Sequence, residues 1–352
     1  MSNVDEREWK EFYISDIVNS FNSNAYHSEN LEFNDSDEYI AYITRTANQN
    51  GLYGFADNDG KEYKINPSNT ISYGAETAEF YYQQFPYITG NKMYYLSSER
   101  MSKYLGLFLV TELRKGIKSC FSYANGAIPD RVMRKKIMLP IDSKGKPDYV
   151  FMEKLIKEKE KHLQDEYRKY CIDVVRKLGK PVEITQLSQK DWREFFIDDI
   201  FSISSGKRLE SYNMTVGNTP FIGATDSGNG ITNYISNVND SLDENVLGVN
   251  YNGNGMVISF YHPYKCLFSD DVKRFHLKNY DDNKFVLLFF KTIILQQKSK
   301  YNYGYKFNET RMKRQKIKVP VNKDKKPDYE YMEQYIKNKM ILMYNRYLDY
   351  KK

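Results

Sequence analysis

The sequence is poor in the residues from which metal centres and disulfide frameworks are built. Its 352 residues include only three cysteines and four histidines. Cys120, Cys171 and Cys266 are widely separated, so their spacing indicates neither a disulfide framework nor a zinc site. We expect buried thiols in a reducing compartment. The histidines are not grouped at metal-ligand spacings either, and no metal is expected in this chain.

Motifs for catalysis and for membrane insertion are also missing. The glycine turns at Gly228 and Asn252 precede no expected helix, as a phosphate-binding loop requires. The Asn/Asp-Pro-Pro-aromatic tetrapeptide of amino-methyltransferases is absent. The most apolar run, Phe285 to Leu295, is short and is interrupted by Lys291. The acidic N-terminal segment has no apolar stretch, so we expect a cytoplasmic protein without a membrane partner.

Positive charge is in slight excess and is unevenly distributed. Lys and Arg number 52 against 46 Asp and Glu, which gives a net charge of +6. The basic residues gather in residues 131–146 and again in residues 291–326. Such clustering indicates a polyanionic partner better than the net charge does.

The two basic clusters belong to an internal repeat that spans the chain. The only two tryptophans, Trp9 and Trp192, stand in the similar segments EWKEFYISDI and DWREFFIDDI. The segment RVMRKKIMLPIDSKGKPDY from Arg131 returns as RMKRQKIKVPVNKDKKPDY from Arg311, so both pairs are about 180 residues apart. A repeat of this length predicts two similar domains related by a pseudo-twofold axis, each followed by a helix.

Each repeat contains the same series of expected elements. The Trp segments predict a short strand with core positions, including the tryptophans, that runs into a turn. Strands from Tyr42 and Phe221 lead into matching Asn-Gly turns, where glycine supplies a positive φ. The basic segments alternate apolar and cationic residues, which predicts a strand with a cationic exposed face. Beyond the KPDY turn, apolar residues spaced three and four apart predict a long amphipathic helix.

The order of these blocks resembles the specificity subunits of bacterial restriction-modification systems. The likeness covers the whole chain and rests on the W-[KR]-E-F segments, the R-x-x-R-x-K-I-x-[LV]-P segments and the helix that closes each repeat. Type I subunits share this organisation, and the short final helix favours the small subunit of BcgI-like Type IIB enzymes. The resemblance implies an α+β fold with two target recognition domains, each a mixed sheet with packed helices, joined by an antiparallel coiled-coil spacer.

The resemblance also implies boundaries, partners and cofactors. It divides the chain into recognition domains at residues 1–147 and 181–327, and spacer helices at residues 148–180 and 328–352. Each domain would read one half of an asymmetric, bipartite site on double-stranded DNA. The helices would bind a methyltransferase or a fused methyltransferase-nuclease, and S-adenosylmethionine and Mg²⁺ would belong to those partner subunits. The chain itself would be non-catalytic, without a cofactor, and would serve phage defence.

Candidate contact residues follow from the physics of DNA recognition. Residues that differ between the repeats are expected to read bases. Cations found in both repeats, aided by three lysines of the second repeat, are expected to bind phosphates. The base-reading candidates are Thr44, Arg45, Thr46, Asn48, Asn50, Thr225, Asp226, Ser227, Asn229, Asn252 and Asn254. The phosphate candidates are Arg131, Arg134, Lys136, Lys298, Lys300, Lys306, Arg311, Arg314 and Lys316. The residues expected to pack the helix pair are Met152, Leu155, Ile156, Leu163, Tyr167, Val174, Met332, Tyr335, Ile336 and Leu342.

Two other functions remain open at the level of sequence. One is a decoy or anti-restriction protein that binds the same DNA or the same partner without serving a restriction enzyme. The other is a standalone enzyme whose site is not recognised, which would place a strongly perturbed carboxylate or histidine in a pocket.

Overall fold

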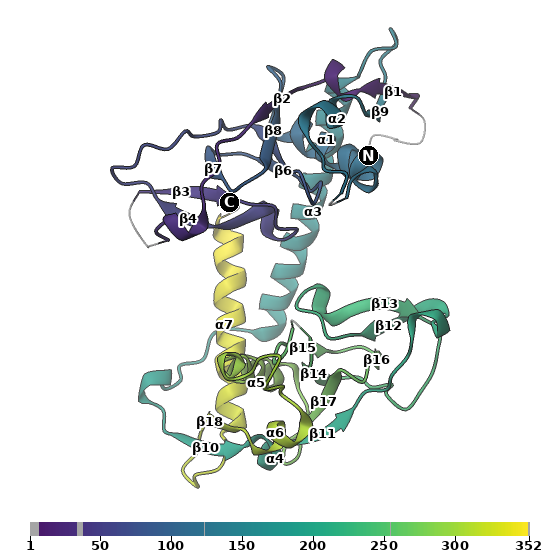
Figure 1. The fold of residues 1–352 in the computed structure, drawn as a ribbon. Helices are drawn as coiled ribbons and strands as arrows, with labels where there is room; N and C mark the ends of the chain where they lie inside the picture. Colours follow the sequence, from purple (N-terminus) through teal and green to yellow (C-terminus); the bar gives the residue numbers. More distant parts are fainter. Residues whose placement is uncertain (1–6, 34–37, 123, 254, 351–352) are drawn as a thin grey trace. The chain divides into compact units, whose positions relative to one another are not determined.

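The fold is described from a computed structural model that covers residues 7–33, 38–122, 124–253 and 255–350 (Figure 1). Contacts within the chain divide it into two units, residues 1–167 and residues 168–352. The boundary falls inside one helix, α3 (Tyr149–Leu178). Each unit contains strands and helices in the order that the repeat predicts, which confirms the duplicated α+β organisation.

Each unit is closed by pairing its first strand with its last. In unit 1, β1 (Trp9–Tyr13) lies antiparallel to β9 (Lys136–Pro140), with Trp9 opposite Pro140. In unit 2, β10 (Trp192–Phe196) pairs with β18 (Lys316–Pro320), with Trp192 opposite Pro320 (Figure 1). We call these two-stranded sheets clasp 1 and clasp 2. Their registers are identical residue for residue.

The side chains of the two clasps make the same contacts. Lys136 pairs with Glu11 across clasp 1 at 3.2 Å, and Lys316 pairs with Glu194 across clasp 2 at 3.5 Å. Each tryptophan stacks on a phenylalanine of its own unit at an interplanar angle of 21°, with centroids 6.1 Å apart in unit 1 and 6.4 Å apart in unit 2. The expectation that both tryptophans are core residues was wrong, because Trp192 is 37% exposed and covers the phenylalanine from outside.

The chain segment that connects the two strands of each clasp forms two further sheets. In unit 1, a four-stranded sheet has the order β2-β8-β5-β6 and a three-stranded sheet has the order β4-β3-β7. The bounds are β2 (Asn19–Asn22), β3 (Tyr39–Ile43), β4 (Leu52–Asp57), β5 (Thr70–Gly74), β6 (Phe80–Gln83), β7 (Tyr87–Thr89) and β8 (Met93–Ser97). Unit 2 repeats both sheets, in the orders β11-β17-β14-β15 and β13-β12-β16. The bounds are β11 (Phe201–Ser205), β12 (Val216–Ile222), β13 (Ile231–Ile235), β14 (Val246–Asn250), β15 (Ser259–His262), β16 (Leu267–Phe268) and β17 (Val272–Leu277).

One apolar helix packs on the four-stranded sheet of each unit. In unit 1 it is α1 (Lys103–Ile117), where Ser102 accepts the backbone N–H of Leu105 as an N-cap. In unit 2 it is α5 (Lys284–Leu295), capped by Asn283. Contact with the sheet is close in unit 1, since a Cβ at Gly106 would lie 2.3 Å from the ring of Tyr82. Short helices precede the closing strands: α2 (Pro129–Met133) before β9, and α6 (Glu309–Arg314) before β18; α4 (Ile197–Ile200) follows β10.

The helix that follows each clasp packs its first turns against its own unit. Met152 and Leu155 of α3 belong to the buried core of unit 1, and Ile156 packs against that core. Met332 of α7 (Tyr329–Tyr350) belongs to the core of unit 2, with Tyr335 and Ile336 packed against it. These six residues therefore do not pack a helix pair as expected. The KPDY turn lays the start of each helix over the apolar helix and clasp of its own unit, so its stripe completes a domain core.

Further along, within unit 2, the two helices contact each other. The ring of Tyr170 lies edge-on to that of Tyr344 with centroids 5.9 Å apart, and Arg168 donates to the Leu348 carbonyl at 3.4 Å. Since residue numbers rise on one helix as they fall on the other, the last turns of α3 and α7 run antiparallel, as predicted. Val174 is half-buried, whereas Leu163, Tyr167 and Leu342 are exposed; Cys171 and Ile341 are the buried residues here.

The structure tests what the composition predicted for the cysteines and for membrane-spanning helices. Cys171 and Cys266 are buried as expected, but Cys120 is exposed, because it lies in a short 3₁₀ turn after α1. Among the residues that the structure describes, no helix combines the length and the apolar character needed to cross a membrane.

The junction between clasp and helix gives a test of unit 2. Lys190 forms an ion pair with Asp328 at 2.6 Å, and both side chains are less than one-fifth exposed. Asp328 also caps α7 by accepting the backbone N–H of Tyr331. The change Lys190→Met leaves this carboxylate without its partner, and we expect it to lower the free energy of unfolding of unit 2 by about 1–3 kcal/mol.

Urea unfolding followed by tryptophan fluorescence measures this loss. In a Trp9→Phe background Trp192 reports on unit 2 alone, since the chain has one tryptophan per repeat. The control Arg176→Met breaks an exposed pair with Asp173 and should change stability by less than about 0.5 kcal/mol. Equal effects of the two changes would show that the Lys190 pair is not structural.

Candidate nucleic-acid interface

The predicted Asn-Gly turns have the same backbone conformation in the two units. Between β3 and β4, Asn50 and Gly51 have φ of 58° and 78°; between β12 and β13, Asn229 and Gly230 have φ of 54° and 79°. Both residues of each pair are thus left-handed, which asparagine and glycine adopt most readily. The repeat therefore places one such turn at the end of the three-stranded sheet in each unit.

Four of the base-reading candidates hold these turns together. Asn50 donates its side-chain amide to the Tyr82 carbonyl at 3.1 Å, and Asn229 donates to the Tyr264 hydroxyl at 2.9 Å. The Thr46 hydroxyl accepts the backbone N–H of Asn48, and the Thr225 hydroxyl accepts that of Ser227. Side chains engaged in their own turn are poor candidates for reading bases. The Ser227 hydroxyl is also engaged in its turn, since it lies within hydrogen-bond distance of the Thr225 hydroxyl at 3.4 Å. Thr44, Arg45, Asn48 and Asp226 remain the better candidates of this set.

Arg45 is held by a carboxylate that the sequence did not indicate. Its guanidinium forms an ion pair with Glu76, and Lys92 binds the same carboxylate at 2.9 Å. The hydrogen bond from Lys92 and then the charge of Arg45 keep the pKa of the Glu76 carboxyl below its usual value. The stem of Arg45 packs over Gly74, where a Cβ would lie 2.6 Å from it. Glu76 and Gly74 thus fix the direction of the Arg45 side chain.

The loop that follows β5 in unit 1, and β14 in unit 2, lies against the Asn-Gly turn of the same unit. In unit 1 this is the Arg45 contact with Glu76. In unit 2, the side chain of Asn250 donates to the carbonyls of Thr225 and Gly255, which ties the loop after β14 to the turn. Asn252 donates to Asp271 at 3.0 Å, and Asn254 lies outside the described residues.

The basic segments join the same edge of each unit. In unit 1, Ala127 donates its N–H to the Ala75 carbonyl at 2.7 Å, so the segment before α2 abuts the loop after β5. Arg131 donates to the Asn125 side chain at 2.9 Å and Lys136 is engaged in clasp 1. In unit 2, Arg311 donates to the Lys306 carbonyl at 2.8 Å and stacks on Tyr305, while Lys316 is engaged in clasp 2.

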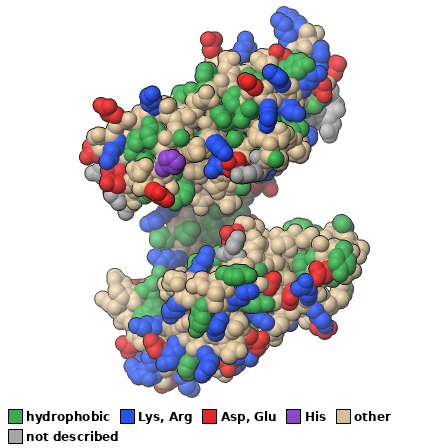
Figure 2. Space-filling view, in the orientation of Figure 1, with side chains coloured by type: hydrophobic (Ala, Val, Ile, Leu, Met, Phe, Trp, Pro, Cys, Tyr) green, Lys and Arg blue, Asp and Glu red, His purple; other side chains and the backbone are tan. Residues whose placement is uncertain are grey.

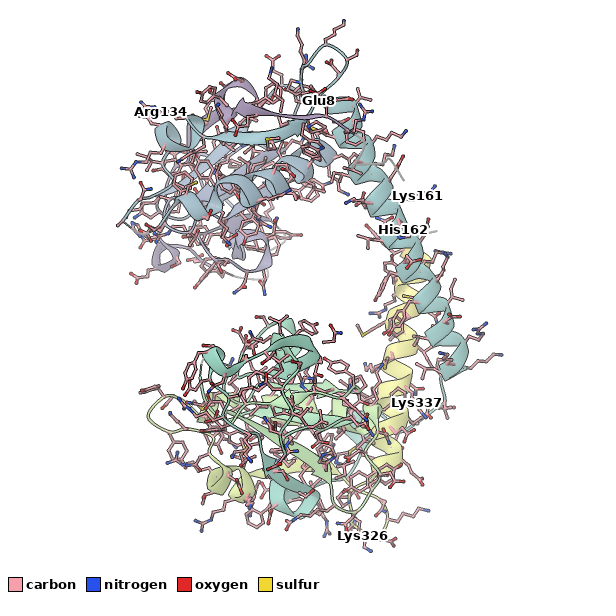
Figure 3. The ribbon with its side chains drawn as sticks, turned by 90° about the vertical axis from the view of Figure 1, so that its right-hand side faces the viewer. Glu8, Arg134, Lys161, His162, Lys326 and Lys337 are labelled. Atoms are coloured by element: carbon pink, nitrogen blue, oxygen red, sulfur yellow. The ribbon has the colours of Figure 1, made fainter. Side chains whose placement is uncertain are left out.

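Two arginines at equivalent positions are not engaged. Arg134 follows α2 and Arg314 ends α6, and both are exposed. Within the described parts of the chain, neither guanidinium has an ion-pair or hydrogen-bond partner. Figure 3 shows Arg134 at the side of unit 1 away from α3. Of the shared cations, these two are the most available to an external anion.

Two of the three remaining predicted cations of unit 2 line a hollow. Lys298 and Lys306 line a cavity of about 480 Å³ together with Asn252, whereas Lys300 is turned to the Gln297 side chain at 2.7 Å. A base-reading candidate and two phosphate candidates therefore meet here. The sequence missed Tyr301, Tyr303 and Tyr305, which stand between these lysines; their alternate spacing was the available signal.

The turn, the following loop and the basic segment form one continuous surface in each unit, which we call the variable edge. It comprises residues 44–50, 74–76 and 125–134 in unit 1, and residues 223–229, 250–253 and 298–314 in unit 2. On the side of each unit that Figure 2 shows, Lys and Arg side chains are interspersed with Asp and Glu side chains.

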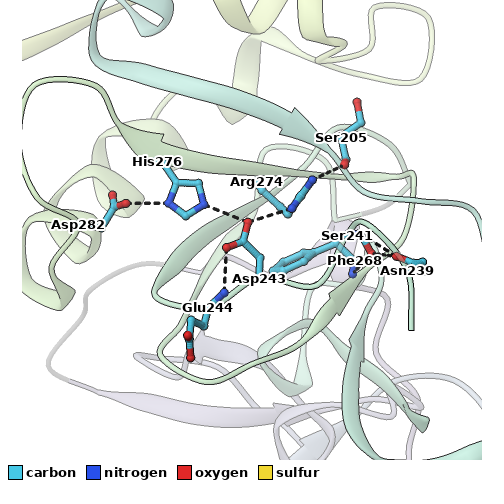
Figure 4. Close-up of polar contacts among 9 residues, drawn as sticks. All are labelled: Ser205, Asn239, Ser241, Asp243, Glu244, Phe268, Arg274, His276 and Asp282. Carbon is cyan, nitrogen blue, oxygen red and sulfur yellow. Dashed lines mark hydrogen bonds and ion pairs between the residues drawn. The ribbon is translucent and has the colours of Figure 1, made fainter. Parts of the chain in front are cut away.

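A histidine between two carboxylates is the titratable cluster most like a catalytic site. His276 of β17 binds Asp282 at 2.7 Å through Nδ1 and Asp243 at 3.0 Å through Nε2, and Arg274 also binds Asp243 (Figure 4). The two hydrogen bonds raise the pKa of His276 to about 9, so the imidazole is cationic at neutral pH. Both ring nitrogens are engaged by carboxylates, so the cluster ties β17 to the loops before β14 and α5.

A second histidine is buried without polar partners. His262 is fully buried in β15, and within the described residues neither ring nitrogen has a hydrogen-bond partner. Burial, followed by the charge of Lys291, lowers its pKa to about 4, so the ring is neutral. By strand register His262 is equivalent to Gln83, because His262 pairs with Val246 where Gln83 pairs with Thr70. Alignment of the sequences alone would match it with Phe85 instead.

The chain belongs to the Type I restriction modification DNA specificity domain family, whose sequence pattern matches residues 6–167 and 189–347. It is 41% identical over 329 residues to the Type II restriction enzyme BgcI specificity subunit S.BcgI of Heyndrickxia coagulans, covering 94% of each chain. A Type-I restriction-modification system S subunit from M. genitalium is 16% identical, with a TM-score of 0.45 over 99% of this chain and 92% of that chain. The HsdS subunit from Thermoanaerobacter tengcongensis is 11% identical, with a TM-score of 0.33 over 96% and 91%.

The structural role of His276 predicts a pH dependence. Its pKa of about 9 in the folded chain lies above the ordinary value of 6.5, so folding favours the protonated form. This stabilisation is complete below about pH 6.5 and is lost as the pH rises through 9. We expect His276→Gln to lower the free energy of unfolding by roughly 2 kcal/mol at pH 6, with the deficit shrinking toward pH 9.

Urea unfolding at a series of pH values tests this. His162, which is exposed on α3 (Figure 3), gives the control variant His162→Gln, which should match the parent throughout. A deficit for His276→Gln that does not change with pH would mean that its charge is not what stabilises unit 2.

Proposed function

We propose that this chain is the DNA-specificity subunit of a restriction-modification complex and that each unit reads one half of an asymmetric, bipartite site on double-stranded DNA. Membership of the specificity-domain family and 41% identity to a specificity subunit support this role. The observation that supports a site of two halves is a contrast between the parts of each unit. The two clasps have the same strand register at every position, whereas the two variable edges carry different side chains. A shared frame with different contact residues suits two readers of different sequences.

Roles within each variable edge are assigned by availability. Arg134 and Arg314 are proposed to bind phosphates, since they occupy equivalent positions and are unengaged, and such contacts carry no sequence information. Arg45 is proposed to read a guanine, for which a fixed guanidinium presents two parallel donors. Asp226 occupies the corresponding turn of unit 2, and its carboxylate can accept from a cytosine amino group. The two halves of the site should therefore differ.

Catalysis is assigned to partner subunits. A methyltransferase, or a methyltransferase fused to a nuclease, would supply S-adenosylmethionine chemistry and Mg²⁺-dependent cleavage, and this chain would bind neither cofactor.

The clasps offer equivalent contacts for two copies of one partner. Their exposed charges recur in both units, as Lys10 and Glu11 in clasp 1 and as Arg193 and Glu194 in clasp 2. The variable edges are less suited to binding two copies of one partner, because their side chains differ between the units.

Selection from randomised duplexes tests the proposal. The full chain, alone and with its methyltransferase, is used to retain duplexes at a stated salt concentration, because affinities for DNA depend strongly on salt. We expect two short, different motifs separated by a constant gap. A single continuous motif, or retention without any motif, would contradict the bipartite reading.

The free arginines predict a change in affinity without a change in preference. Arg134→Ala and Arg314→Ala should each weaken binding to all sequences and reduce the salt slope by about one, because one phosphate contact is lost. The control Arg176→Ala removes an exposed arginine of α3 that lies outside the variable edges and should leave the slope unchanged. A shift in the selected motif would instead make either arginine a base reader.

The Arg45 assignment predicts the opposite pattern. Arg45→Ala and Glu76→Gln should both reduce discrimination at one base pair of one half-site about tenfold, since either change removes a correctly held guanidinium. Competition between duplexes that differ at single positions measures this. The control Glu62→Gln changes an exposed carboxylate of the same unit. Uniform weakening at all positions would show that Arg45 binds the backbone.

A further inference from the structure

A turn in unit 2 presents three tyrosines in alternation. Residues 301–306 join the 3₁₀ turn Lys298–Lys300 to the segment before α6. Asn302 and Tyr305 close the turn through reciprocal backbone hydrogen bonds of 3.3 and 3.0 Å, and the Asn302 side chain also accepts the N–H of Tyr305. We call residues 301–306 the tyrosine turn. These hydrogen bonds hold the backbone of the turn in one conformation and so fix where its side chains start.

Two of the tyrosines are used to build the turn. The ring of Tyr305 contacts the Arg311 guanidinium, 3.8 Å from its centroid, and stacks on the ring of Tyr301, with centroids 5.7 Å apart and an interplanar angle of 10°. The Tyr301 hydroxyl also donates to Gln315 at 2.7 Å. Tyr303 differs from both, because it is 87% exposed. Lys306 lies beside its ring, with Nζ 5.3 Å from the centroid.

The tyrosine turn borders two cationic hollows, and the ring of Tyr303 lines the first of them. One, of about 480 Å³, is lined by Tyr303, Lys298 and Lys306 with the amides of Asn252 and Asn302. The other, of about 630 Å³, shares Tyr301 and is lined by Arg311 and Arg314. Among the described residues that line either hollow there is no aspartate or glutamate. Amides, phenols and cations around an aromatic ring match the phosphate and base of a nucleotide.

The corresponding turn of unit 1 has a different character. It is closed by the same pair of backbone hydrogen bonds, between Ser122 and Asn125. Gly126 stands in the place of Lys306 and packs against the Ala75 carbonyl, and Lys118, in the place of Lys298, is paired with Glu79. Among the residues that the structure describes in unit 1, neither position that matches Lys298 or Lys306 holds an unpaired cation, and Tyr123, which matches Tyr303, lies outside them.

We propose that the tyrosine turn is a binding element for an unpaired nucleotide of a DNA strand, whose base stacks on Tyr303 while Lys298 and Lys306 bind the adjoining phosphates. A regular duplex offers no free base face to this ring, because its bases are stacked and paired, whereas an unpaired strand does. Stacking on an aromatic ring tolerates any base, so the element adds affinity without adding sequence preference. The inference rests on the proposed function only in that the chain binds DNA.

Fluorescence anisotropy of the full chain with a labelled oligothymidylate, and separately with a fully paired duplex of equal length, tests this. Tyr303→Ala should weaken binding to the oligothymidylate roughly tenfold, whereas Tyr303→Trp should preserve it. Lys306→Met should weaken it and lower the salt slope. Tyr303→Ala should leave duplex affinity within about twofold. The matched control is Tyr212→Ala, which removes a tyrosine of unit 2 that is 82% exposed but does not line either hollow, and should have no effect.

Three results would overturn the inference. They are failure of the parent chain to bind the oligothymidylate, equal effects of Tyr303→Ala and Tyr212→Ala, and equal weakening of duplex and single strand by Tyr303→Ala. None of these alters the outcome of duplex selection, which tests the proposed function separately. If the chain selects a bipartite duplex but does not bind the oligothymidylate, the proposed function stands and the proposed role of the tyrosine turn is wrong.

Discussion

The pairing of the first strand of each unit with its last is the contact on which the other features depend. Clasp 1 and clasp 2 bring the two ends of a long segment together and hold them with the same register, the same Lys-Glu pair and the same stacked tryptophan. With its ends fixed, the segment between them can change in loops while the sheets and the apolar helix remain. The clasp also fixes where the following helix starts, and Asp148 and Asp328 cap those helices at equivalent positions.

The variable edges show how one frame supports different chemistry. In unit 1 the turn carries an arginine that Glu76 and Lys92 hold in place, and the basic segment is compact around Gly126. In unit 2 the turn carries Asp226, and the basic segment opens into a hollow beside Tyr303. The turns themselves remain alike, because the side chains of their asparagines and threonines are engaged in hydrogen bonds within each unit. Divergence is therefore concentrated in side chains that the fold does not need.

The fold could be predicted from the sequence where the signal is local or repeated. Strand alternation, the Asn-Gly turns and the helix stripes each lie within a few residues, and the second copy corroborates the first. Contacts between distant segments could not be predicted. The stripe of α3 and α7 indicates a buried face but not its partner, so Met152 and Met332 were assigned to a helix pair instead of domain cores. Likewise nothing near Arg45 in the sequence identifies Glu76, and only strand register relates His262 to Gln83.

The central claim, that each unit reads its own half-site within a common frame, is most directly tested by a chimera. Residues 14–135, which lie between the strands of clasp 1, are replaced by residues 197–315 from between the strands of clasp 2. Because the two clasps share one register, the transplanted segment should fold in its new place. The account predicts that selection from randomised duplexes by the chimera yields the half-site of unit 2 twice. Recovery of the two different parental motifs would contradict it.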